Sequence, residues 1–215
     1  MNIQQQKIGA RPLRIAVLVS GSGSNLQALI DASEEGQLPQ VELALVVSNR
    51  ADAQGLQRAL AHKIPALYLP WQQREEAERK LTAILDTFQV DLIVLAGWLR
   101  IFNANFVRRY PQRIINLHPA LLPDDGNSKT YTTSDGTRIP ALRGLHVVQQ
   151  ALDAGIKVTG SSVHYVVPEV DAGPVLLRAE VPILPDDDEE TLHERIKYEE
   201  HRLVVEAVNR LARAR

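Results

Sequence analysis

The sequence contains no cysteine among its 215 residues. Disulfide bonds, thiolate ligands for metal ions and cysteine nucleophiles are therefore excluded, and the absence fits a reducing compartment. No window is long and apolar enough to span a bilayer, and residues 1–13 lack the apolar stretch of a signal peptide. We expect a cytoplasmic protein without a membrane partner.

An excess of charge of either sign is also absent. The 24 Lys and Arg residues oppose 26 Asp and Glu residues, which gives a net charge of −2. No basic block is present, so binding to nucleic acid through bulk electrostatics is not expected. The six histidines show no H-E-x-x-H or paired spacing, and we predict no metal site.

Apolar runs alternate with amphipathic segments along the first half of the chain. Because continuous apolar runs are typical of buried parallel strands, this alternation predicts an α/β fold. The expected fold is a doubly wound, mostly parallel sheet with helices on both faces. The predicted strands cover residues 14–20, 41–48, 66–69, 90–97 and 113–118, and the helices cover 26–32, 55–62, 74–88 and 103–110.

The second half begins with residues 124–142, which are rich in turn formers and lack periodicity. We interpret them as a long inserted surface loop, with room for a small hairpin at S-D-G-T. A helix over 145–154, two strands around the turn P-E-V-D-A-G-P and an acid-started helix to Arg215 follow. The prediction is one domain over 14–215 behind a tail of residues 1–13.

Ligands of parallel α/β sheets bind beyond the carboxyl ends of the strands. Ser20, Gly97 and His118 fall at three such ends. The loop S-G-S-G-S-N (20–25) lacks the third glycine of a dinucleotide fingerprint and the G-K-[ST] of a Walker loop. We expect it to bind a phosphate monoester at the start of the following helix. The alternative is a glycine-rich turn in which serine caps the helix.

Asn116 and His118 share one face of their predicted strand, because side chains alternate along strands. Histidine changes charge near neutral pH, and asparagine can donate a hydrogen bond to an oxyanion. Asp171 would form an acid–base pair with His118 if the last strands fold back over the sheet. The alternatives are a satisfied buried Asn–His pair and an ordinary turn aspartate. His164 is either a satisfied strand histidine or part of the same site.

The chain resembles the formyltransferase family in six motifs, in order over roughly residues 13 to 210: V-L-V-S-G-S-G-S-N-L-Q-A-L, V-S-N-R-A-D-A-x-G-L, L-A-G-W-L-R-I, I-I-N-L-H-P-A-L-L-P, G-S-S-V-H-Y-V and D-A-G-P-V. The serine-glycine loop narrows the resemblance to phosphoribosylglycinamide formyltransferases. It implies a formyltransferase fold with a Rossmann-like N-terminal half. It also implies that 10-formyltetrahydrofolate donates a formyl group to glycinamide ribonucleotide in purine (IMP) synthesis, without a metal.

The resemblance also implies roles for individual residues. The catalytic residues would be Asn116, His118 and Asp171: Asn116 and a protonated His118 would stabilise a tetrahedral oxyanion, and Asp171 would aid proton transfer. The residues that bind the nucleotide would be Gly23, Ser24, Asn25, Lys197 and Glu200. Those that bind the folate would be Arg74, Leu99, Arg100, Ile101, Phe102, Val167, Pro168, Glu169 and Val170.

One departure from the family is the long connection before R-G-L-H (143–146). It could cover the substrates, mediate oligomer contacts or have no fixed structure. Three other functions are considered. A methionyl-tRNA formyltransferase usually adds a C-terminal RNA-binding domain, a formyltetrahydrofolate deformylase has a regulatory domain before the first strand, and a non-catalytic nucleotide-binding module needs no Asn-His-Asp set. A homodimer, the polyglutamate preference and the binding order stay open.

Overall fold

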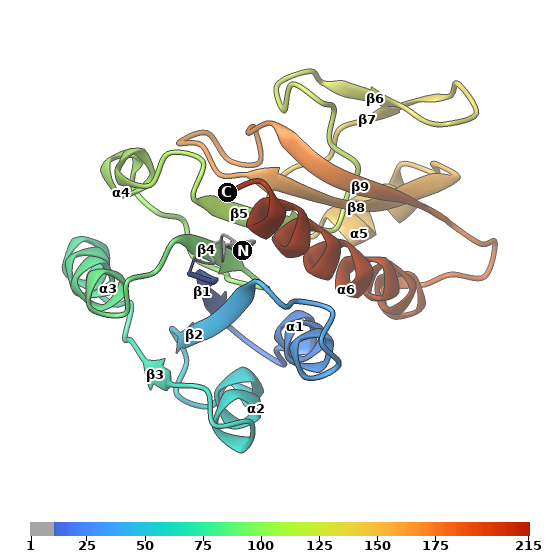
Figure 1. Ribbon diagram of the computed structural model, residues 1–215. Helices are drawn as coiled ribbons and strands as arrows, with labels where there is room; N and C mark the ends of the chain where they lie inside the picture. The colour runs from blue at the N-terminus through green and yellow to red at the C-terminus, as the bar shows by residue number, and fades with distance from the viewer. Residues whose placement is uncertain (1–10) are drawn as a thin grey trace, which may run out of the picture.

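The computed structural model describes residues 11–215. Its main element is a seven-stranded sheet with the strand order β3-β2-β1-β4-β5-β8-β9 (Figure 1). Most of the predicted tail, residues 1–13, lies outside the described residues, and Leu13 already belongs to β1. The inserted segment carries a separate two-stranded ribbon, β6-β7.

The first five strands of the large sheet pair in parallel, and β8 and β9 join antiparallel at one side. The mostly parallel α/β fold is therefore confirmed. The strand predicted over 90–97 is shorter in the structure. The strands are β1 (Leu13–Val19), β2 (Val41–Ser48), β3 (Ala66–Tyr68), β4 (Leu92–Leu95), β5 (Ile114–His118), β6 (Thr130–Thr132), β7 (Arg138–Pro140), β8 (Val158–Tyr165) and β9 (Val175–Pro182).

Helices cover both faces of the sheet, as the alternating pattern predicts (Figure 1). Helices α1, α2 and α6 pack on one face, and α3 and α4 pack on the other. The predicted helix 145–154 begins later, since His146 takes a left-handed conformation before Val147. The helices are α1 (Ser24–Glu34), α2 (Gln54–Ala61), α3 (Arg74–Thr87), α4 (Ala104–Arg109), α5 (Val147–Asp153) and α6 (Glu189–Arg213).

The β1 strand shows why the sheet is buried on both sides. Ile15 and Val17 pack in the core beneath α1 and α6, whereas Ala16 and Leu18 pack in the core beneath α3 and α4. Alternate side chains of a strand point to opposite faces, so a strand covered on both faces must be apolar throughout. Full burial of each such valine, leucine or isoleucine side chain stabilises the fold by about 1.5–3 kcal/mol.

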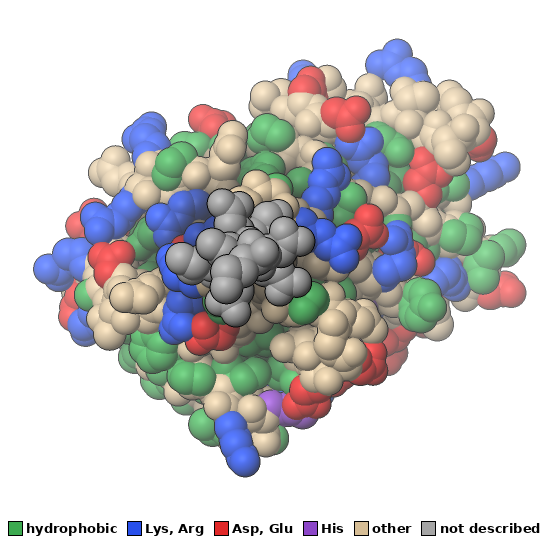
Figure 2. Space-filling model, in the orientation of Figure 1, with side chains coloured by type: hydrophobic (Ala, Val, Ile, Leu, Met, Phe, Trp, Pro, Cys, Tyr) green, Lys and Arg blue, Asp and Glu red, His purple; other side chains and the backbone are tan. Residues whose placement is uncertain are grey.

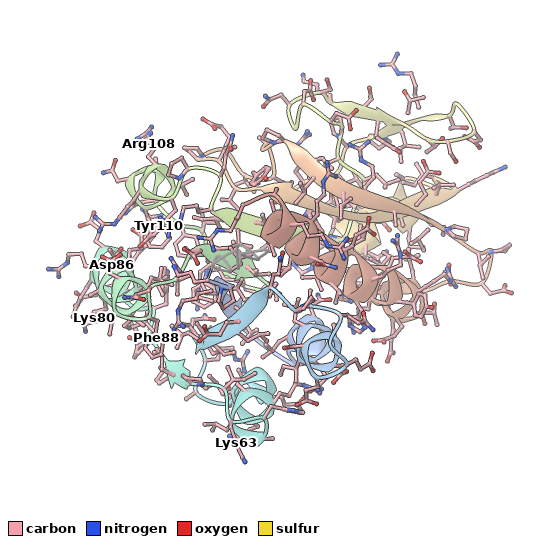
Figure 3. The ribbon with its side chains drawn as sticks, in the orientation of Figure 1. Lys63, Lys80, Asp86, Phe88, Arg108 and Tyr110 are labelled. Atoms are coloured by element: carbon pink, nitrogen blue, oxygen red, sulfur yellow. The ribbon has the colours of Figure 1, made fainter. Side chains whose placement is uncertain are left out.

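The outer surfaces of the helices are polar. Lys80 of α3 and Arg108 of α4 are exposed, whereas Tyr110, just after α4, is buried against the α3/α4 core (Figure 3). Basic and acidic side chains are interspersed over the face shown in Figure 2. Within residues 11–215, no helix combines the length and the apolar character needed to cross a bilayer.

Gly23 offers a test of the packing between α1 and α2. Its φ is +69°, and a Cβ added there would lie 2.7 Å from the Gly55 Cα, whereas Gly36 has φ +75° and open space around it. We expect Gly36→Ala to lower the free energy of unfolding by about 1–2 kcal/mol from backbone strain. Gly23→Ala should lose about 1–3 kcal/mol more, because the clash is with backbone. Urea denaturation of both variants measures the difference, and equal losses would contradict it.

Candidate active site

A cavity of about 750 Å³ opens at the carboxyl ends of the central strands. Gly97 and His118, which follow or end β4 and β5, line it. Ser20, at the end of β1, fixes the neighbouring loop: its hydroxyl donates to Asn49 Oδ1 at 2.6 Å and accepts the Leu99 N–H at 2.9 Å. The cavity therefore lies where the order of parallel strands predicts a ligand site.

Four polar side chains meet at one wall of this cavity. Asn116 of β5 lies opposite His164 of β8, and its Nδ2 is 3.1 Å from His164 Nε2. The Asp171 carboxylate is 3.5 Å from His118 Nδ1 through Oδ2 and 3.5 Å from His164 Nε2 through Oδ1. The last strands do not fold back over the sheet, as the sequence-based hypothesis supposed, but extend it antiparallel beside β5. The turn between β8 and β9 nevertheless brings Asp171 to His118.

His164 orients the amide of Asn116. Its Nδ1 is 2.9 Å from the Tyr165 carbonyl, so in the neutral ring Nδ1 carries the hydrogen and Nε2 accepts one. Nε2 then accepts from Asn116 Nδ2. The histidine is 2% exposed and has a partner, yet it also lines the cavity. His164 is therefore both a buried strand histidine with a hydrogen-bond partner and part of the site, the two interpretations that the sequence left open.

Asp171 is held as a carboxylate. Burial raises its pKa, but the contact with His164, the charge of His118 and the hydrogen bond from the Gly144 N–H at 2.8 Å outweigh burial. The pKa of Asp171 consequently lies below its ordinary value. An ionised, mostly buried side chain beside an imidazole can stabilise a proton on that ring.

His118 is only 3% exposed, and its two ring nitrogens differ. Nε2 donates to the Leu142 carbonyl at 2.8 Å, whereas Nδ1 has only the looser 3.5 Å contact with Asp171. Burial lowers the pKa of His118, and the Asp171 carboxylate acts in the opposite direction. The protonated form of this ring therefore depends on Asp171, and Nδ1 is the nitrogen with room for another partner.

The predicted folate residues other than Arg74 line one part of the cavity, most of them with apolar side chains. Leu99 and Ile101 are 65% and 63% exposed, and Val170 is 47% exposed, an unusual concentration of open apolar side chains. The others that line the cavity are Arg100, Phe102, Val167, Pro168 and Glu169. Arg74 instead lies on the surface at the start of α3, beside Arg79 and outside the cavity lining.

Of the predicted nucleotide residues, two line the cavity and three do not. Asn25 and Glu200 line the cavity and join through a hydrogen bond of 3.0 Å from Asn25 Nδ2 to Glu200 Oε2. Burial raises the pKa of Glu200, although Asn25 and Lys197 oppose the shift. Gly23, Ser24 and Lys197 are not among the cavity-lining residues, and the Lys197 Nζ is 2.5 Å from Glu194. Gly23 caps the start of α1.

Sequence reasoning missed three contributions to this wall. The polar neighbours of His193 in the sequence favour a solvated histidine, but in α6 it is half-buried and lines the cavity. Gly144 and the Leu142 carbonyl contact Asp171 and His118 through backbone atoms. Glu200 and His193 are seven residues apart in α6, which puts them about two turns apart on the same face of the helix, a signal that the sequence carries. The contacts of Gly144 and Leu142 use backbone atoms, which every residue type carries, so the sequence holds no signal for them.

Comparison with known proteins gives a consistent picture. Residues 13–208 match the protein family described as formyl transferase. The phosphoribosylglycinamide formyltransferase of Escherichia coli (strain K12) is 40% identical over 192 residues, which cover 88% of this chain and 82% of the relative. The crystal structure of glycinamide ribonucleotide transformylase 1 from Symbiobacterium toebii is similar with a TM-score of 0.84 and 38% identity, covering 96% of this chain and 91% of that one.

A trifunctional purine biosynthetic protein of Drosophila melanogaster is 44% identical over 201 residues. That match covers 92% of this chain and only 14% of the fly protein. The chain thus spans a small part of the trifunctional relatives and most of the bacterial ones.

Proposed function

Because the chain belongs to the formyl transferase family, we propose that it transfers the formyl group of 10-formyltetrahydrofolate to the amine of glycinamide ribonucleotide, a step of purine (IMP) synthesis. The convergence of Asn116, His118 and Asp171 in one cavity carries the proposal. The similarity to relatives that are named for this acceptor supports the choice of substrate.

The cavity has a place for each substrate. The exposed apolar side chains Leu99, Ile101 and Val170 suit the flat ring system of a folate. Asn25 and Glu200 offer an amide and a carboxyl group to a ribose. The N-terminus of α1, at Gly23 and Ser24, presents free backbone N–H groups that favour a phosphate. Lys197 would reach it by leaving Glu194, and Arg74 would meet the outer end of the folate.

In the reaction, the amine nitrogen would first add to the formyl carbon to give a tetrahedral intermediate, and the bond from that carbon to N10 would then break. One proton moves from the amine to N10, so the products are the formylated amide and tetrahydrofolate. Negative charge develops on the formyl oxygen at the tetrahedral stage. Asn116 Nδ2 would donate a hydrogen bond to this oxygen. It would do so either with its second hydrogen, while the first stays hydrogen-bonded to His164, or after its hydrogen bond to His164 has broken.

His118 and Asp171 would carry the proton. Burial disfavours a charged imidazolium at His118. In this proposal the ring is neutral at first and takes up a proton when the amine releases one. Nδ1 would hold that proton beside the Asp171 carboxylate and then release it to N10. This proposal differs from what the family resemblance implies, which is a protonated His118 that donates a hydrogen bond to the oxyanion together with Asn116.

An acceptor assay tests the proposal. The purified protein is given 10-formyltetrahydrofolate with glycinamide ribonucleotide, with methionyl-tRNA or with water alone, and loss of the formyl donor is followed by absorbance. We expect rapid consumption only with glycinamide ribonucleotide. Consumption with methionyl-tRNA or with water would contradict the proposed acceptor, and no consumption with any of them would leave a nucleotide-binding module.

A further inference from the structure

Residues 124–142, here called the inserted arm, form a folded element docked on the sheet. The β6-β7 hairpin projects beside β9 (Figure 1). Glu180 of β9 holds it by accepting from the Tyr131 hydroxyl at 3.0 Å and from the Ser134 N–H at 2.7 Å. At the other end of the arm, Asp124 forms an ion pair with Arg178. The arm therefore has a fixed place in the structure.

The segment that leaves the arm contacts both members of the acid–base pair. The Leu142 carbonyl accepts from His118 Nε2 at 2.8 Å. Arg143 Nε donates to the Asp171 carbonyl at 3.0 Å, and the Gly144 N–H donates to Asp171 Oδ2 at 2.8 Å. Three consecutive residues thus set the position of one imidazole and one carboxylate.

Arg143 ties this segment to the beginning of the arm. Its Nη2 donates to the Gly126 carbonyl at 2.7 Å and the Ser128 carbonyl at 2.9 Å, and Nη1 donates to the Ala141 carbonyl at 3.2 Å. All of its recorded partners are main-chain carbonyls, and the carboxylate of Asp171 is not among them. A guanidinium can do this because its planar fork carries five N–H donors.

The arm and the Asp171 loop also approach closely through backbone. Asp171 has φ +50°, a left-handed conformation that strains a non-glycine residue and persists only where the surrounding structure holds it. A Cβ on Gly126 would lie 2.2 Å from the Ala172 carbonyl oxygen and 2.4 Å from that of Gly173. Only glycine fits this contact, so the backbone of the arm packs directly against the loop that carries Asp171.

We infer that the inserted arm is a positioning element of the active site. Residues 142–144 hold His118 and Asp171 in their relative positions, and Arg143 fastens residues 142–144 to the arm. The inference rests on the proposed function, since it assigns the arm a part in that reaction. No residue from 124 to 143 lines the cavity. The arm therefore acts on the pair through its contacts and does not cover the substrates.

Two glycine variants separate positioning from general loosening of the arm. Gly126→Ala would push the arm off the Asp171 loop, whereas Gly136→Ala has the same kind of positive φ, in the same arm, with open space around it. With glycinamide ribonucleotide and formyl donor, we expect Gly126→Ala to lower kcat by about 10- to 100-fold, as small misplacements of catalytic groups do. The KM values should change little, and Gly136→Ala should match the wild type. Equal kcat for the two variants would overturn the inference.

Chemical rescue tests the guanidinium itself. We expect Arg143→Ala to lower kcat by a similar factor and added guanidinium ion, below denaturing concentration, to restore part of it. Sodium chloride at equal ionic strength should restore nothing. Arg138→Ala, which removes an exposed arginine from the same arm, is the matched control. A failure of guanidinium to restore activity would overturn the role of Arg143.

A readout that needs no substrate keeps the two proposals apart. If the wild-type protein transfers no formyl group to glycinamide ribonucleotide, the proposed function fails, and the arm is then judged by NMR. We expect the ring-nitrogen shifts of His118 to move in Gly126→Ala and to stay unchanged in Gly136→Ala. Unchanged shifts in both would overturn the positioning role.

Discussion

Replacing Asp171 with asparagine is expected to lower kcat by about 10²- to 10⁴-fold, the range of general acid–base catalysis. The substitution keeps the shape of the side chain but removes the charge that stabilises a proton on His118. Because Asp171 does not belong to the predicted nucleotide residues, the KM for glycinamide ribonucleotide should change little. Steady-state kinetics at saturating formyl donor measure both constants.

The same variant makes a prediction about pH. The Asp171 carboxylate raises the pKa of His118, so its removal must lower that pKa further below the ordinary value of histidine. NMR titration of the His118 ring in both proteins measures the shift. Asp186→Asn, an exposed aspartate far along the chain, is the control and should leave kcat and the pKa of His118 unchanged. A near-wild-type kcat in Asp171→Asn would remove Asp171 from the mechanism.

Asn116→Ala is expected to lower kcat by about 10²- to 10³-fold, the loss measured when one oxyanion donor is removed. The side chain touches His164 within the protein, so its truncation leaves a buried imidazole nitrogen without its donor as well. The KM values should stay close to the wild type, since the donor acts on charge that develops during the reaction.

Asn105→Ala is the matched control for that variant, because Asn105 is an exposed asparagine of α4 outside the cavity lining. It should leave both constants unchanged. If Asn116→Ala raised KM and left kcat intact, Asn116 would bind substrate in the ground state and would not serve as the oxyanion donor.

The sheet and one wall of the site could be predicted from local patterns. The predicted strand over 113–118 is Ile114–His118 in the structure, and alternation along it places Asn116 and His118 on the cavity wall. The rule that ligands bind beyond the carboxyl ends of parallel strands predicts the place of the cavity from the order of the strands alone. These predictions work because strand geometry and parallel topology fix side-chain direction over short distances.

The remaining parts depend on contacts between distant segments. The inserted arm has no periodicity, and its docking on Glu180 joins residues 46 positions apart, which no local pattern indicates. His146 takes a left-handed backbone conformation, so α5 begins at Val147 and is shorter than predicted; non-glycine residues adopt this conformation rarely, and the periodicity gives no sign of it. The hydrogen bonds of residues 142–144 to the catalytic pair use backbone atoms for two of the three contacts, so residue type could not predict them.

The central claim is that an amide and an imidazole from β5 and a carboxylate from the turn between β8 and β9 act on one carbonyl carbon. A crystal structure with glycinamide ribonucleotide and a folate analogue that carries carbon in place of N10 tests it most directly. We predict the formyl oxygen within about 3 Å of Asn116 Nδ2, the amine facing His118 Nδ1, and the Asp171 carboxylate still beside that ring. A formyl group bound elsewhere in the cavity, or an Asp171 side chain turned away from His118 with both ligands in place, would contradict the account.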